Sequence, residues 1–92
     1  MPFWFYKPHP NPTWEELAAE VRYVSKRQLK HLWPKRFLPA IQNIDDGKMF
    51  PGFIKMFSEL ARDGDWDGLR QDLASFFDQM PKLNPPPAVP KL

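Results

Sequence analysis

The sequence predicts an all-α protein: a small domain of three to four helices between an extended N-terminal arm and a proline-rich C-terminal tail. Apolar residues recur at helical spacing in three segments, at about residues 14–33, 51–62 and 66–79. No segment of comparable length alternates polar and apolar residues as a half-buried strand does. Prolines concentrate before the first helical segment and after the last. We therefore expect three parts: an arm (residues 1–12), a helical domain (13–80) and a tail (81–92).

The arm places four consecutive aromatic residues before a run with proline at every second position. These aromatic residues are Phe3, Trp4, Phe5 and Tyr6. The proline run excludes a helix and favours an extended path, and monomers seldom leave so large an apolar patch in water. Successive side chains of an extended segment face opposite ways, so one surface covers one pair more easily than both. This geometry favours a protein partner for the arm, with packing on the chain's own helices as the alternative.

The first helix is expected from about Trp14 to Trp33, with a capping box formed by Thr13 and Glu16 and a stop at Pro34. Its apolar arc holds Trp14, Leu17, Ala18, Val21, Val24, Leu29 and Leu32. The opposite arc is basic, with Arg22, Lys26, Arg27 and Lys30. Six Lys and Arg residues lie between positions 22 and 36 without an acid. This face is either a docking patch or an ordinary solvated helix surface.

The remaining helices are bounded by proline, glycine and aspartate. Residues 34–48 predict two short helical pieces or one broken piece, followed by a turn at Asp45-Asp46-Gly47. Pro51 begins the next helix, Gly64 suits its left-handed end, and Asp65 caps the last helix. The predicted buried faces are Phe53, Met56, Phe57 and Leu60 in one helix, and Trp66, Leu69, Leu73, Phe76, Phe77 and Met80 in the other.

Composition argues against an enzyme and against a cofactor. The chain has no cysteine, and its two histidines are His9 in the arm and His31 in the first helical segment. The three serines lie in predicted helices without the sequence context of a nucleophile. Cysteine chemistry is excluded, and no signal peptide or apolar run of membrane-spanning length is present. We therefore expect an intracellular protein of a reducing compartment, cytoplasmic or in an organelle matrix, rather than a secreted one.

A weak metal-site candidate lies at Asp63, Asp65 and Asp67, in the segment DGDWDG. Carboxylates at alternate positions before a glycine are typical of the opening of a helix–loop–helix calcium site. The twelfth position of that motif, which normally holds a bidentate glutamate, is Ala74. The favoured interpretation is a helix end followed by an aspartate cap.

These observations lead to the prediction of a non-catalytic accessory or adaptor subunit that docks on a larger protein complex. The net charge of +2 is unevenly distributed: residues 1–44 carry seven Lys and Arg against three acids, and residues 45–80 carry four against eight. The alternatives are a basic-faced nucleic-acid-associated protein or inhibitor of a nucleic-acid machine, and a degenerate calcium-responsive module. The predicted partner contacts are Phe3, Trp4, Phe5, Tyr6, Arg22, Lys26, Lys30 and the tail residues Pro85, Pro86, Pro87 and Pro90.

Overall fold

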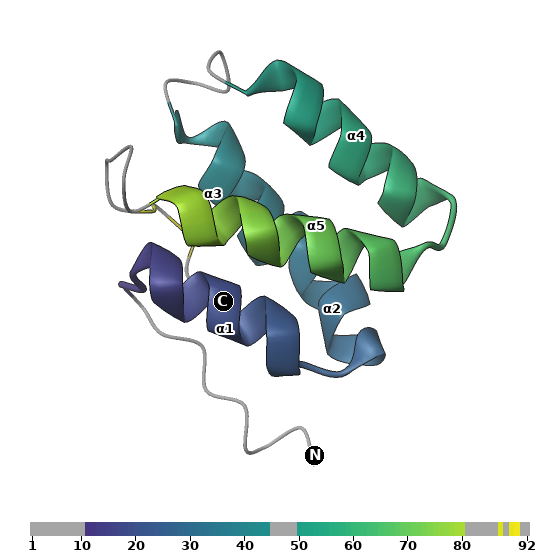
Figure 1. Cartoon of the computed structure of the whole chain (residues 1–92), viewed down its shortest axis with the longest axis horizontal. Coiled ribbons are helices and arrows are strands. Elements are labelled where there is room, and N and C mark those ends of the chain that lie inside the picture. Colours follow the sequence, from purple (N-terminus) through teal and green to yellow (C-terminus); the bar gives the residue numbers. More distant parts are fainter. Residues whose placement is uncertain (1–10, 45–49, 81–86, 88, 91–92) are drawn as a thin grey trace.

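A computed structural model of the chain describes residues 11–44, 50–80, 87, 89 and 90. This part of the chain is helical and contains no strand, which confirms the predicted all-α class. Its elements are α1 (Trp14–Tyr23), α2 (Lys26–Leu32), the π-helical segment η2 (Trp33–Phe37), α3 (Leu38–Gln42), α4 (Pro51–Arg62) and α5 (Trp66–Gln79) (Figure 1). The aromatic residues of the arm, the predicted turn at 45–47 and most of the tail lie outside the described residues.

The prediction of one helix from Trp14 to Trp33 is wrong, because the helix breaks before Ser25. The Ser25 hydroxyl accepts a hydrogen bond from the Gln28 N–H (3.1 Å), and Gln28 Oε1 accepts one from the Ser25 N–H (2.8 Å). This reciprocal pair is a capping box, and it starts a new helix. Val24 and Leu29, on either side of the break, are both buried, so the apolar pattern continues across it.

Pro34 does not end the helical path either. The backbone continues through η2 and α3, with Pro34 and Pro39 in the first two positions of these segments. The Leu38 N–H donates to the carbonyl of Trp33, five residues earlier, instead of following the α-helical ladder. The wider turn keeps the chain helical where proline interrupts that ladder, and it directs Arg36 and Phe37 into the interior.

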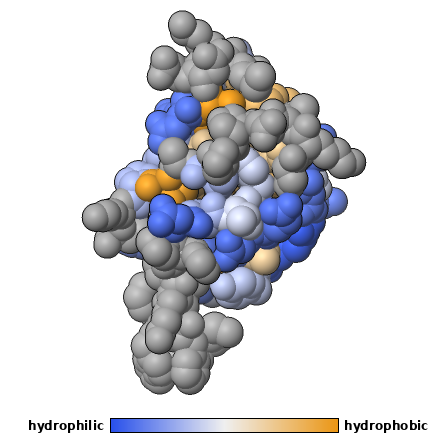
Figure 2. All heavy atoms as spheres, turned by 90° about the vertical axis from the view of Figure 1, so that its left-hand side faces the viewer, coloured by the Kyte–Doolittle hydropathy of each residue, from blue (hydrophilic) through white to orange (hydrophobic). Residues whose placement is uncertain are grey.

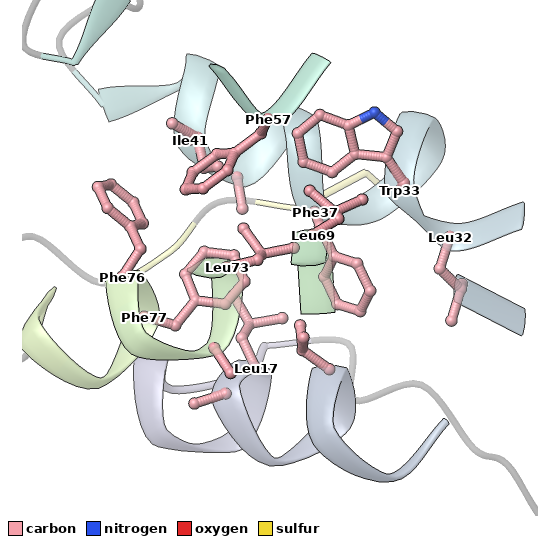
Figure 3. Packing of buried hydrophobic residues seen from close by; sticks show 14 of the residues in the cluster. Leu17, Leu32, Trp33, Phe37, Ile41, Phe57, Leu69, Leu73, Phe76 and Phe77 are labelled. Carbon is pink, nitrogen blue, oxygen red and sulfur yellow. The ribbon is translucent and has the colours of Figure 1, made fainter. Parts of the chain in front are cut away.

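Helix α5 lies at the centre of the fold, antiparallel to both α1 and α4 (Figure 1). Its predicted buried face is confirmed except that Trp66 is only half-buried. Figure 3 shows side chains from α1, η2, α3, α4 and α5 converging on one core. The most completely buried apolar side chains include Leu17, Phe37, Phe57, Leu69, Leu73 and Phe77.

Helix α4 covers the core less completely than the sequence predicted. Within its expected buried face only Phe57 is buried, Leu60 is half-buried, and Phe53 and Met56 remain 45% and 38% exposed. Gly64 has a φ of 79°, as expected for a left-handed helix end. The α4–α5 connection is therefore as predicted, whereas part of the apolar face of α4 is left at the surface.

Candidate interaction surfaces

A stripe of basic side chains covers the outer surface of α2 and η2. We define the basic stripe as Lys26, Arg27, Lys30, His31 and Lys35, which are all exposed. Residues 26 and 30, and residues 27 and 31, are four apart and share helix faces. None of these side chains forms an ion pair with an acid in the part of the chain that the structure describes. Within the described residues, the stripe therefore faces solvent with its charge uncompensated.

Arg36 belongs to the same basic run in the sequence, but the structure buries it. Its Nε lies 2.7 Å from Glu20 Oε1 and its Nη2 lies 2.7 Å from Glu20 Oε2, so the pair is bidentate. Both side chains are almost completely inaccessible, at 1% for Arg36 and 6% for Glu20. Arg36 thus joins η2 to α1 and contributes nothing to the outer surface.

Arg22 is exposed, but it is engaged with Asp78 of α5. Arg22 Nη1 lies 3.0 Å from Asp78 Oδ1, and its Nη2 contacts Asp78 Oδ2. This hydrogen-bonded pairing raises the pKa of Arg22 and lowers the pKa of Asp78. Of the three predicted basic contacts, Lys26 and Lys30 therefore stand in the stripe, while Arg22 lies before the helix break and holds α1 to α5.

Arg70 of α5 caps the C-terminal end of α1, a role that the sequence pattern did not predict. Its Nη1 lies 2.9, 3.1 and 2.6 Å from the carbonyl oxygens of Val21, Arg22 and Val24. Carbonyl groups at a helix C-terminus lack intrahelical hydrogen-bond donors and carry partial negative charge. A guanidinium supplies both the donors and the positive charge. The only sequence signal was a lone arginine in the otherwise acidic first turns of the last helix.

The three aspartates of DGDWDG act at helix ends in the structure. Asp65 caps α5, because its Oδ1 accepts a hydrogen bond from the Gly68 N–H at 3.0 Å. Asp63 terminates α4, and Asp67 lies in the first turn of α5. Across residues 11–44 and 50–80, no three His, Asp or Glu side chains gather into a group that could hold a metal ion. The capping interpretation is confirmed for Asp65.

A second surface feature is a groove between α4 and α5, which we call the α4–α5 groove. It measures about 260 Å³ and is lined by Phe53, Met56, Asp72, Ser75, Phe76 and Gln79. The rings of Phe53 and Phe76 lie 5.1 Å apart, so the floor is aromatic. The sequence predicts that Phe53 and Met56 belong to a buried helix face. Met56 and Phe76 lie at the edges of their apolar arcs, where two packed helices leave a groove.

The tail returns to the helical domain at one point. Val89 is half-buried and packs against the hydrophobic core, and Pro87 is half-buried as well. Pro90 is exposed. Phe3, Trp4, Phe5, Tyr6, Pro85 and Pro86, the other predicted partner contacts in the arm and tail, lie outside the described residues.

Comparison with known proteins assigns no function to the chain, so functional inference rests on the basic stripe and the other surface features described above. The chain matches no protein-family model, and no curated protein or solved structure matches it. None of the helices in the described part of the chain combines the length and the apolar character needed to cross a membrane.

Proposed function

We propose that the chain is a non-catalytic accessory subunit, an adaptor that docks on a larger protein assembly through its helical body and its aromatic arm, Phe3 to Tyr6. The observation that supports this proposal is the uncompensated basic stripe on α2 and η2. The two neighbouring arginines, Arg22 and Arg36, each have an acid partner, whereas the stripe has none among the described residues. The partner surface that complements the stripe is acidic.

The arrangement of the stripe has an energetic cost in the free protein. Like charges four residues apart on a helix repel each other by a few tenths of a kcal/mol per pair. Lys26 and Lys30 form such a pair, and α2 has no acid in its first turn to offset them. An acidic surface on a partner removes this repulsion, steers the encounter and fixes the orientation of docking.

Capture experiments with matched charge variants test the proposal. The tagged chain is used to recover partners from its native extract, and the double variant Lys26→Glu/Lys30→Glu is compared with Lys55→Glu/Arg62→Glu. Both variants change the net charge equally, but Lys55 and Arg62 are exposed on α4, outside the stripe. We expect the first variant to lose the partner and the second to retain it. Equal capture by the two variants, with circular dichroism unchanged, contradicts the proposal.

A nucleic-acid-associated function is the second candidate, because phosphates also complement a basic stripe. The aromatic residues near the stripe argue against base stacking: Trp33 and Phe37 are buried, and only Tyr23 is exposed, at 55%. Titration of duplex DNA and single-stranded RNA at 50 and 200 mM salt distinguishes the two functions. Binding that weakens steeply with salt and disappears in Lys26→Glu/Lys30→Glu would replace the adaptor proposal.

A further inference from the structure

The α4–α5 groove has the chemistry of a socket for an aromatic side chain. Phe53 and Met56 at its edge keep 45% and 38% of their surface exposed, although Phe76 beneath them is buried. Its volume of about 260 Å³ is below the roughly 300–1,000 Å³ of clefts that enclose whole small molecules. The space therefore suits one large side chain, packed at an angle against the rings of Phe53 and Phe76.

One carboxylate lines the groove, and a second lies on α4 nearby in the sequence. The first is Asp72 on α5, and the second is Glu59, which is exposed on α4 one turn after Met56. Neither carboxylate forms an ion pair with another described residue. An occupant that combines aromatic anchors with an adjacent cation complements both the floor and these carboxylates. Within this sequence, the run from Phe3 to Tyr6 followed by Lys7 has that composition.

The groove also lies near the point from which the arm departs. Helix α1 begins, α5 ends and α4 begins at the same end of the molecule (Figure 1). Ring contacts connect the two places: Trp14 to Phe77 at 5.7 Å, Phe77 to Phe76 at 6.0 Å, and Phe76 to Phe53 at 5.1 Å. Figure 2, which views this end, shows hydrophobic patches at the surface between hydrophilic atoms.

The arm is long enough to reach the groove from its root. Pro12 is buried and fixes that root beside Trp14. The three ring contacts limit the separation of the Trp14 and Phe53 rings to about 17 Å. Phe3 to Tyr6 lie six to nine residues before Pro12, which is about 18–28 Å along an extended proline-rich chain at ~3.1 Å per residue. The extended arm is therefore longer than the straight-line separation of the two rings, which leaves length for a path over the surface.

We propose that the α4–α5 groove binds the chain's own aromatic arm, with one ring of Phe3–Tyr6 inserted beside Phe53 and Phe76 and Lys7 paired with Asp72. The inference concerns the purified chain alone, in which the arm has no partner to bind, and its test does not depend on the adaptor proposal. A partner that takes the arm would at the same time uncover the groove.

Disulfide trapping tests this inference cleanly, since the chain has no native cysteine. In the full-length protein, Pro8→Cys is combined with Gln79→Cys at the groove, or with Lys30→Cys on α2 as the control. We expect the first pair to form an intramolecular disulfide at least tenfold faster than the control pair. Adding Phe53→Asp should abolish this difference. Asp72→Lys should weaken it, and Lys7→Asp combined with Asp72→Lys should restore it.

Two outcomes overturn the inference. Disulfide-linked dimers identify the occupant as the arm of a second copy, and equal trapping of both pairs shows that the arm does not visit the groove. A second measurement guards against variants that fail to fold. In amide NMR spectra of the full chain, Phe3→Ser/Phe5→Ser should shift the signals of Phe53, Met56 and Phe76 and leave those of α2 in place. Unshifted groove signals contradict the inference.

Discussion

At the residue scale, the ion pair between Glu20 and Arg36 is buried, so the loss of one partner should affect stability strongly. Glu20→Gln removes the carboxylate charge that faces the buried Arg36 guanidinium, which we expect to cost about 3–5 kcal/mol in free energy of unfolding. Replacing both partners by apolar residues of similar volume, Glu20→Leu/Arg36→Met, should cost less, because no charge then stays buried. Urea denaturation gives the free energy of unfolding of the wild type and of both variants. If the double variant is less stable than Glu20→Gln, the ion pair itself makes a net favourable contribution to the free energy of unfolding.

Arg22 and Asp78 form the contrasting, exposed pair, with a predicted pH dependence. Because the pairing lowers the pKa of Asp78, its stabilising contribution is present above the ordinary aspartate value near 3.8 and is lost as the pH falls through the lower folded value. Asp78→Asn should therefore be slightly less stable than wild type at pH 7, and the two should converge once the pH falls below the lowered folded pKa of Asp78. Thermal unfolding from pH 2 to 7 checks this. A difference that persists unchanged at pH 2 would assign the effect to something other than the carboxylate.

At the scale of elements, the break between α1 and α2 depends on the Ser25 cap. Ser25→Ala removes the hydroxyl acceptor for the Gln28 N–H, and we expect a loss of about 1 kcal/mol. Ser25→Asp keeps an acceptor at this position and serves as the matched control. The opposite result is informative: a more stable Ser25→Ala protein would mean that α1 and α2 merge into the continuous helix that the periodicity predicts. Denaturant titration with circular dichroism measures stability and helix content together.

The sequence predicts the buried residues better than the helix boundaries. Val24 and Leu29 were placed correctly in the core, because an apolar pattern is preserved wherever two helices share one core. The Ser25–Gln28 capping box was present in the sequence, but it fell inside a longer periodic run that favoured continuity. The burial of Arg36 depends on the π-helical turn and on Glu20, sixteen residues earlier, so local pattern could not show it. Likewise, the groove depends on how α4 and α5 pack against each other, which the sequence pattern of either helix does not show.

At the scale of the whole molecule, stability should be distributed unevenly between an α1–α5 unit and a more loosely held α4. Helices α1 and α5 each contain five buried residues, whereas in α4 only Phe57 is buried. Side-chain bonds from Arg22 and Arg70 further join α1 and α5. Elements with few buried contacts open at lower free energy than the global unfolding reaction.

Native-state hydrogen exchange should therefore show α4 opening before the rest of the molecule. We expect the mid-helix amides of α4 to exchange at least tenfold faster than those of α1 and α5, because only Phe57 of α4 is buried, whereas α1 and α5 each contain five buried residues. Phe57→Leu should raise the exchange of α4 further while changing that of α1 little, since the Phe57 ring packs against Trp33, Phe53 and Phe76. Leu17→Ala in α1 is the matched control, because it should accelerate exchange in all helices together. Equal protection of α4 and α5 in the wild-type protein would instead mean that the helices unfold as one cooperative unit.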